Sequence, residues 1–336
     1  MSGVPSAVLF CPGRGSYGRD ELGFLARTLR PGPVAEALQR ADAERKQAGQ
    51  PTVSELDAAS QFKPGLHLQG GNAAALIYFG ALAHLEVLRE RYRIVAVAGN
   101  SLGWYTALAA AGVLSPYDGW RLIRTMAELQ AKVQGGQILT SVVDEEWRRD
   151  AVAEAELERA LAATNARGKE FFVARSIRLG GHEVLAGTEL GIVALLEALK
   201  RRKVGEREFP FRLAGHGPFH TELCVATAEE ALPLLSALPA RQPHAWLVDG
   251  EGALHSPWSA DPLELLRWTA TAQVVRTFDV TACVRVALRE FNTDVALCAG
   301  PGTSLRAPVG HVVLAQGWRG LRNKKDLFDS GIVRID

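Results

Sequence analysis

Alternating apolar and polar blocks predict strands and helices in regular succession. Residues 7–11 form a short apolar run that ends in a glycine-rich turn, which is typical of a buried strand. In residues 72–89 the apolar side chains recur at helical spacing, and the β-branched run at 94–98 predicts a second buried strand. Two further helices are predicted over residues 104–111 and 117–133.

The middle of the chain, residues 138–212, has the pattern of a separate unit. Its predicted order of elements is βαββαβ, which is the ferredoxin-like arrangement, with Gly180–Gly181 marking a hairpin turn. The predicted elements are a strand at 138–143, a helix at 150–163, strands at 171–179 and 182–185, a helix at 189–201 and a strand at 208–213. Residues 213–336 return to the α/β style of residues 1–137, so we expect one large domain with residues 138–212 inserted.

Composition narrows the class of protein. The chain has 336 residues, 47% hydrophobic and 22% charged, which is typical of a soluble globular protein. The net charge of +1 favours neither nucleic acid nor a membrane as a partner. The four cysteines are scattered without CxxC spacing, so we expect reduced thiols and no metal site. The N-terminus lacks the basic start of a signal peptide, and we expect a cytoplasmic enzyme.

The clearest chemical signal is a G-x-S-x-G pattern at residues 99–103, between the predicted strand at 94–98 and the helix that follows. Strand, tight turn and helix are the setting of a nucleophile elbow, so the pattern predicts Ser101 as a nucleophile. A serine hydroxyl is a weak nucleophile and needs a neighbouring base. The backbone N–H of Leu102 falls at a helix N-terminus, where it can stabilise an oxyanion.

Two histidines are candidates for the base. His216 and His220 share a glycine-broken loop between a predicted strand and a helix, and such loops hold catalytic groups more often than helix faces do. The residues alone do not decide between these two. The other six histidines lie in segments without another catalytic cue: His67, His84, His182, His244, His255 and His311.

Four motifs resemble malonyl-CoA:acyl-carrier-protein transacylases and the acyltransferase domains of polyketide synthases. Residues 11–17, Cys-Pro-Gly-Arg-Gly-Ser-Tyr, are similar to the family's Phe-Pro-Gly-Gln-Gly-Ser-Gln, and residues 98–108 to its Ala-Gly-His-Ser-Leu-Gly-Glu-Tyr-x-Ala-Leu. Residues 217–221 resemble the stretch that carries the family's catalytic histidine, and residues 298–305 resemble its Glu-x-Gly-Pro-Gly-x-x-Leu. The motifs occur in the family's order and span nearly the whole chain.

The resemblance implies an α/β-hydrolase-like parallel-sheet core with an inserted ferredoxin-like subdomain. It implies an acyl-serine on Ser101, with His220 as the base, and it places the backbone N–H groups of Arg14 and Leu102 in the oxyanion hole. The substrates would be acyl-CoA and an acyl carrier protein, with no cofactor. Family members often orient the histidine with a main-chain carbonyl; the nearest match here is Asp249, for which an ordinary Asp-Gly turn is the alternative.

The departures from the family fall around the acyl group. Family members clamp the malonyl carboxylate with an arginine, and counting from Ser101 without a gap places Met126 at that position. The absent clamp disfavours a carboxylated acyl group, so we expect an uncharged one that could be larger, although Arg14 keeps malonyl open as an option. The other acyl-pocket candidates are Asn100, Trp104, Gly217 and Phe219.

Two other functions are compatible with the sequence. On the same scaffold, water in place of a thiol would make the protein a thioester hydrolase that clears carrier proteins. A family member without activity would act as a scaffold, although the presence of both Ser101 and His220 argues against this.

Overall fold

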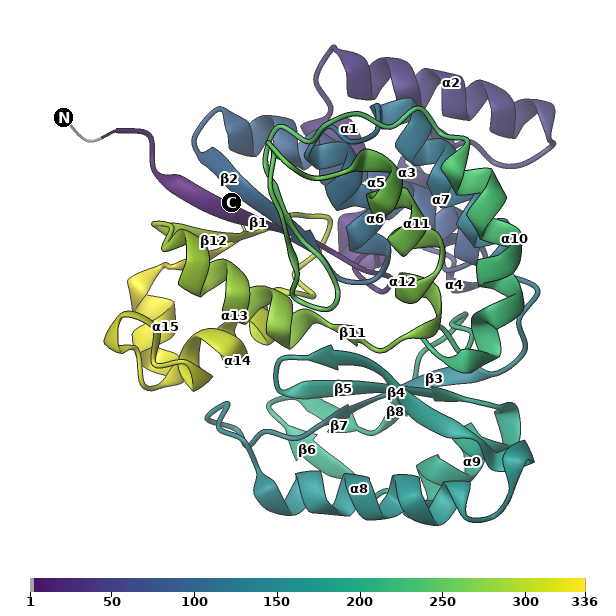
Figure 1. The fold of residues 1–336 in the computed structure, drawn as a ribbon, viewed down its shortest axis with the longest axis vertical. Helices are drawn as coiled ribbons and strands as arrows, with labels where there is room; N and C mark the ends of the chain where they lie inside the picture. Colours follow the sequence, from purple (N-terminus) through teal and green to yellow (C-terminus); the bar gives the residue numbers. More distant parts are fainter. Residues whose placement is uncertain (1–2, 336) are drawn as a thin grey trace.

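The computed structural model describes residues 3–335 and contains a six-stranded, mainly parallel sheet at its centre (Figure 1). In spatial order the strands are β10 (Leu254–His255), β9 (Trp246–Val248), β2 (Arg93–Gly99), β1 (Ser6–Cys11), β12 (Val295–Cys298) and β13 (Val333–Arg334). Only β10 runs antiparallel to its neighbour among these six strands. Strand β1 is buried from Ala7 to Cys11 and strand β2 from Ala96 to Gly99, as expected for central strands with apolar runs. The predicted α/β class with a parallel core is confirmed.

Helices pack around this sheet. Helix α5 (Gly70–Arg89) packs against α6 (Leu102–Ala110) and α7 (Pro116–Gln130), the two helices that follow β2. By length and composition α5 could cross a membrane, yet 83% of its most apolar window is buried inside the protein. A helix that is apolar on all sides is explained by this position in the core.

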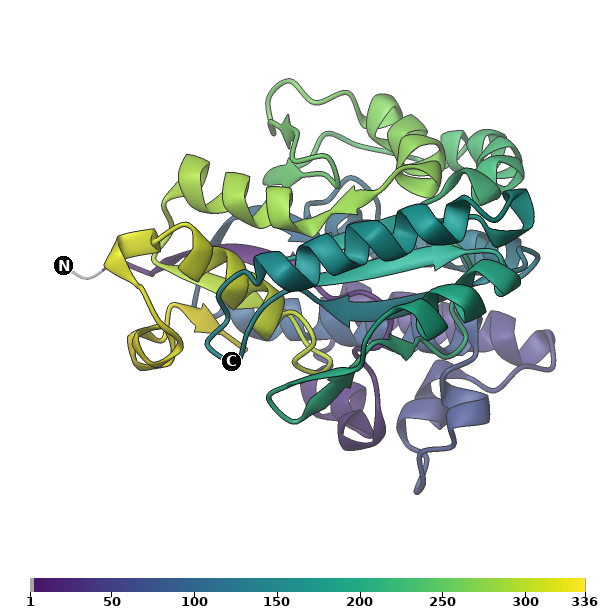
Figure 2. The same ribbon diagram turned by 90° about the horizontal axis from the view of Figure 1, so that it is seen from below.

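A second sheet forms the lower lobe in Figure 1. Its strands, in spatial order, are β11 (Phe278–Asp279), β4 (Val173–Leu179), β5 (His182–Gly187), β3 (Gly136–Ser141) and β8 (Phe211–Arg212). Helices α8 (Ala151–Asn165) and α9 (Glu189–Ala198) cover its outer face (Figures 1 and 2). This arrangement matches the predicted βαββαβ order, with β11 added at one edge by a strand from the large domain.

The two faces of this sheet have different neighbours. Ile138 and Leu185 belong to the small core beneath α8 and α9. Leu139 and Val184, the next residues in each strand, line a cavity on the opposite face. Because side chains alternate along a strand, one sheet can close its own core and also form the roof of a cavity.

Several elements were not predicted. Helix α9 ends at Ala198 instead of residue 201, and a hairpin follows it, formed by β6 (Arg202–Val204) and β7 (Arg207–Phe209). Residues 41–66, a polar stretch whose sequence has only weak periodicity, lie partly in helices of the large domain. The remaining helices are α1 (Phe24–Thr28), α2 (Pro33–Gln47), α3 (Val53–Asp57), α4 (Pro64–His67), α10 (Val225–Ser236), α11 (Pro262–Ala270), α12 (Ala272–Val275), α13 (Val280–Phe291), α14 (Arg306–Ala315) and α15 (Lys324–Ser330).

Candidate active site

Ser101 lies at the end of β2, on the sharp turn into α6. Its backbone has φ 55° and ψ −108°, a conformation that residues with a side chain rarely adopt. Such strain persists only where the surrounding structure enforces it, and it is common at active sites. The turn therefore has the geometry of a nucleophile elbow, as the G-x-S-x-G pattern predicts.

The two glycines of the pattern are required by close backbone contacts. A Cβ atom on Gly99 would lie 2.1 Å from the carbonyl carbon of Gly103, and one on Gly103 would lie 2.1 Å from the carbonyl oxygen of Cys11. No side chain fits in either place, because real Cβ atoms do not approach other atoms so closely. The glycines thus let α6 begin directly against β1 and β2, which holds Ser101 at the surface of the turn.

His220 reaches Ser101 from a loop 119 residues further along the chain. Its Nε2 atom lies 2.7 Å from Ser101 Oγ, whereas His216 contacts Gln137 instead, with 2.9 Å between Nδ1 and Oε1. The loop is held from behind, since the hydroxyl of Ser176 donates to the carbonyl of Phe219 at 2.8 Å. Of the two histidines that the sequence left open, the structure thus brings His220 to the serine.

The other ring nitrogen of His220 fixes the tautomer. Nδ1 lies 2.6 Å from the main-chain carbonyl of Gln273, an oxygen that can only accept, so Nδ1 carries the proton. Nε2 is then unprotonated and presents its lone pair to Ser101. Burial lowers the pKa of His220 to about 4, with the Gln273 carbonyl opposing this shift and the charge of Arg14 adding to it. His220 is therefore neutral at pH 7 and able to accept a proton.

The expectation that Asp249 orients His220 is corrected. Asp249 Oδ2 pairs with His255 Nε2 at 2.8 Å, and Oδ1 accepts from the backbone N–H groups of Glu251 and Ala253. The Asp-Gly turn is thus the right interpretation of this segment. Gln273 was missed because a main-chain carbonyl leaves no mark in the residue type.

Two backbone N–H groups are available near Ser101. Leu102 is the first residue of α6, and Arg14 lies in the loop that leaves β1, the strand beside β2. A Cβ on Gly13 would lie 2.6 Å from the Asn100 carbonyl oxygen, so the two loops are in direct contact. Within residues 3–335, neither N–H donates a hydrogen bond to the protein, which leaves both for a ligand oxygen.

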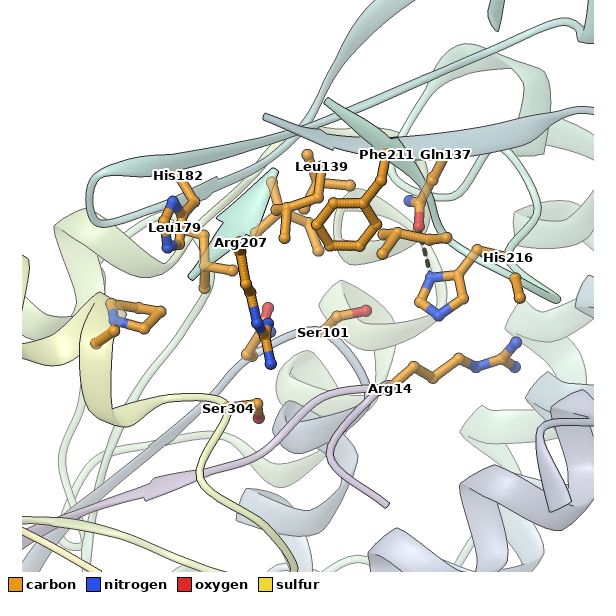
Figure 3. A pocket seen from close by; sticks show the side chains of 18 of the residues that line it. Arg14, Ser101, Gln137, Leu139, Leu179, His182, Arg207, Phe211, His216 and Ser304 are labelled. Carbon is orange, nitrogen blue, oxygen red and sulfur yellow. Dashed lines mark hydrogen bonds between the residues drawn. The ribbon is translucent and has the colours of Figure 1, made fainter. Parts of the chain in front are cut away.

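Ser101 opens onto a cavity of about 550 Å³ between the large domain and the second sheet. The walls are mostly apolar, including Leu139, Leu179 and Phe211, which Figure 3 shows along one side. Arg14, Arg207 and Ser304 contribute polar groups. Cavities of this size and character commonly hold small molecules or cofactor arms.

The cavity walls include only some of the expected acyl-pocket residues. Asn100 and Phe219 line this cavity, and Gly217 lines a second one of about 270 Å³ that Arg14 and Phe219 share. Trp104 and Met126 line neither, which corrects that expectation.

Both excluded side chains belong to the hydrophobic core. Trp104 is fully buried, donates from Nε1 to Thr269 Oγ1 at 2.8 Å and packs edge-on against Trp268. Met126 is 1% exposed and packs inside the same core. Neither can touch a substrate in the cavity without a rearrangement.

Comparison with known proteins agrees with the motifs. No family model matches the sequence. The malonyl CoA-acyl carrier protein transacylase of Synechocystis is 27% identical over 153 residues, which are 45% of this chain and 46% of that protein. The sequence match therefore spans about half the length of the relative.

Solved structures match over nearly the whole chain. The malonyl-CoA:acyl-carrier-protein transacylase of Synechocystis has a TM-score of 0.73 at 20% identity, over 97% of this chain and 99% of that one. The acyl-carrier-protein S-malonyltransferase of Burkholderia pseudomallei has a TM-score of 0.72 at 22% identity, over 91% and 93%. This chain has the transacylase fold. The resemblance suggested by the four motifs is confirmed by these names and this fold.

Proposed function

We propose that this chain is an acyltransferase that moves an acyl group from a CoA thioester to the phosphopantetheine thiol of an acyl carrier protein. The observation that carries the proposal is the relay from Ser101 Oγ through His220 to the Gln273 carbonyl, with spans of 2.7 and 2.6 Å. The relay lies in a cavity large enough for a pantetheine arm. The named activity of the relatives supports the same assignment.

In the first half-reaction, Ser101 Oγ attacks the thioester carbonyl while His220 Nε2 takes its proton. The carbonyl π electrons move to oxygen, and the N–H groups of Arg14 and Leu102 stabilise that oxyanion. Collapse of the intermediate breaks the C–S bond, and the departing thiolate takes the proton from His220. An acyl-serine and free CoA result.

The second half-reaction reverses these steps with a different thiol. His220 accepts the proton of the phosphopantetheine thiol, its sulfur attacks the acyl-serine, and the Ser101 oxygen leaves with that proton. The two half-reactions together conserve protons and electrons, so the transfer needs no cofactor. The setting that fits this chemistry is fatty-acid or polyketide-type biosynthesis in the cytoplasm.

The experiment is intact-mass spectrometry after incubation with acyl-CoA thioesters. Wild-type protein is expected to gain the mass of one acyl group and to lose it on addition of acyl carrier protein. The Ser101→Ala variant should show no adduct while keeping its circular dichroism spectrum. Acylation that persists in this variant would place the nucleophile elsewhere.

Comparing adduct lifetimes separates the transferase from the two alternatives. Loss of the adduct at the same rate without carrier protein would make the chain a thioester hydrolase. No adduct with any thioester, and no labelling by a fluorophosphonate, would make it a scaffold.

A further inference from the structure

Tyr105 is a buried phenol that is bonded to the residue behind the catalytic histidine. It lies on α6, four residues after Ser101, and it is 2% exposed. Its hydroxyl donates to the side-chain oxygen Oε1 of Gln273 at 3.0 Å. Gln273 is also the residue whose main-chain carbonyl lies 2.6 Å from His220 Nδ1. The phenol is thus joined to the base through a single residue.

Neither partner of this hydrogen bond can touch a substrate in the cavities. Tyr105 and Gln273 line neither the cavity at Ser101 nor the smaller one beside it, and Gln273 is also 2% exposed. Burial raises the pKa of Tyr105 far above its usual value, so the phenol keeps its proton at pH 7 and acts as a donor. Any effect of Tyr105 on the reaction must therefore pass through the protein.

The carbonyl that orients His220 lies in a segment with little support of its own. Gln273 belongs to α12 (Ala272–Val275), and a helix of four residues makes too few internal hydrogen bonds to fix its geometry. Within residues 3–335, no backbone N–H donates to the Gln273 carbonyl, because α12 ends before a residue that could do so. The carbonyl is free for His220, and its position depends on how the rest of Gln273 is held.

The side chain of Gln273 is held at both of its polar atoms. Oε1 accepts from the Tyr105 hydroxyl, and Nε2 donates to the main-chain carbonyl of Ser101 at 3.5 Å. The second contact is at the long limit for a hydrogen bond, so the bond from Tyr105 is the stronger of the two. Both contacts come from the nucleophile turn and its helix. The residue that orients the base is therefore positioned by the element that carries the nucleophile.

Helix α6 is suited to this role because it is itself fixed. Its start lies in direct backbone contact with β1 and β2. The residue before Tyr105 makes a parallel bond, since Trp104 Nε1 donates to Thr269 Oγ1 at 2.8 Å, four residues before Gln273. Two neighbouring side chains of α6 thus hold the segment of α11 and α12. Only the bond from Tyr105 acts on the residue that carries the carbonyl.

We propose that Tyr105 is a positioning residue: through the Gln273 side chain, it holds the Gln273 carbonyl where that carbonyl orients His220 toward Ser101. The inference rests on the Ser101–His220 relay of the proposed function and adds to it a residue outside the cavity. Every residue type at position 273 would have a main-chain carbonyl, and Tyr105 determines where that carbonyl lies. Its placement matters because a shift of about 1 Å in a catalytic group can cost about 10²-fold in rate.

The first test measures the rate at which a fluorophosphonate labels Ser101. This probe needs the nucleophile and its base, but neither an acyl-CoA nor a carrier protein. Tyr105→Phe removes one hydroxyl and should lower the labelling rate by roughly 10–10²-fold. Tyr78→Phe is the matched control, because this fully buried tyrosine donates to the Pro116 carbonyl at 2.7 Å, away from the relay. Its labelling rate should stay within about threefold of wild type.

The proton on His220 Nδ1 gives a second readout that does not depend on activity. A proton held in a buried hydrogen bond of 2.6 Å should give a downfield NMR resonance, which His220→Ala would remove. In Tyr105→Phe this resonance should move upfield, because the hydrogen bond to the Gln273 carbonyl lengthens. In Tyr78→Phe it should not move. A role for Tyr105 in stability alone would leave the resonance at its wild-type position.

A double variant separates positioning from stability. Tyr105→Phe and Gln273→Met each leave one buried polar group unpaired, so each should lower the urea midpoint. Combining them removes both polar partners, and the midpoint should recover much of its loss. The labelling rate should stay as low as in Tyr105→Phe, because the carbonyl is still unsupported. If Tyr105→Phe does not fold, Gln273→Met removes the same hydrogen bond and takes its place in both measurements.

Three results would overturn the inference: a labelling rate of Tyr105→Phe within about threefold of wild type, an unmoved His220 resonance, or recovery of the labelling rate together with stability in the double variant. Each of them leaves the proposed function standing. Labelling that depends on His220, without transfer of an acyl group to carrier protein, would reject the transferase and leave this inference in place. A wild type that is neither labelled nor acylated would reject both.

Discussion

The two halves of the active site are built by different means. The catalytic half is fixed by backbone: positive φ at both Ser101 and His220, glycines in van der Waals contact with the neighbouring strand, and a main-chain carbonyl on the histidine. The half that we propose to bind the acyl group is made by side chains, with Arg14 in one wall of the cavity, while Met126 lies in the core. The first half matches the family motifs, and the second departs from them.

This difference shows where a fold of this kind can change. A strained backbone must be held by many contacts at once, so substitutions there disturb the whole turn. A side chain in a cavity wall makes few contacts with the rest of the fold, so it can be substituted without changing its neighbours. The chemistry of an acyl-serine can therefore stay constant while the selected acyl group varies.

The catalytic half should be the more sensitive to change, and His220→Ala should have the largest effect. General-base assistance contributes about 10²–10⁴-fold, so acylation of Ser101 should fall by that factor. His216→Ala should cost less than about tenfold, because His216 bonds Gln137 and not the serine. Acylation rates by rapid quench and intact mass provide the measurement. Equal losses of acylation rate in the two variants would contradict the assignment of His220 as the base and of His216 as a residue that only lines the cavity.

Gly103→Ala tests the steric basis of the elbow. Its Cβ would lie 2.1 Å from the Cys11 carbonyl oxygen, so the variant should lose about 3 kcal/mol or more of its free energy of unfolding. Gly65→Ala is the control, since nothing lies within 4 Å of its Cβ in helix α4. That change should stabilise by about 0.5–1 kcal/mol. Urea denaturation of both variants gives the comparison, and similar stabilities would contradict it.

Acid should destabilise the fold through the histidines around the cavity. Burial is the main cause that lowers the pKa of all four: His182 and His220 to about 4, His216 and His311 to about 3. These histidines are neutral in the folded protein, and after unfolding they take up protons below about pH 6.5. They therefore do not reduce the free energy of unfolding above that pH, and they reduce it increasingly as the pH drops toward 4.

A buried carboxyl acts in the opposite direction. Burial raises the pKa of Glu183 to about 7, so the folded state binds its proton first and the carboxyl offsets about one histidine. The net uptake on unfolding near pH 5.5 is about three protons, or up to ~4 kcal/mol per pH unit. Urea midpoints at pH 7, 6 and 5 measure this slope. Midpoints that do not change over this range would show that the cavity histidines are protonated in the fold.

Local patterns predicted the parts of the molecule that are locally determined. The apolar strands β1 and β2, the helix α5 and the elbow at Ser101 each follow from a short continuous run of residues. The family motifs correctly predicted that His220 contacts the serine, whereas the residues alone did not distinguish it from His216.

Features that depend on distant segments could not be predicted. The Gln273 carbonyl has no residue signal, and the charged β6–β7 hairpin has too short a pattern to separate from the end of α9. Met126 was placed in the pocket by counting, but a count does not show which way a side chain points.

The substitution with the smallest expected effect on catalysis is at Asp249, and it tests whether this residue belongs to the catalytic half. Asp249→Asn should change the acylation rate by less than about threefold, because His220 is oriented by Gln273. A carboxylate that orients a catalytic histidine behaves differently, and its change to asparagine lowers kcat by about 10⁴-fold in the serine protease triad.

The same substitution should still affect stability. Asp249 is 2% exposed and holds His255 and two backbone N–H groups, and an amide can replace only part of those bonds. The free energy of unfolding should therefore fall by about 1–3 kcal/mol. A stability loss with a nearly normal acylation rate places Asp249 in the scaffold around β9. A rate loss of 10³-fold or more in folded protein would mean that Asp249, and not the Gln273 carbonyl, controls the histidine during turnover.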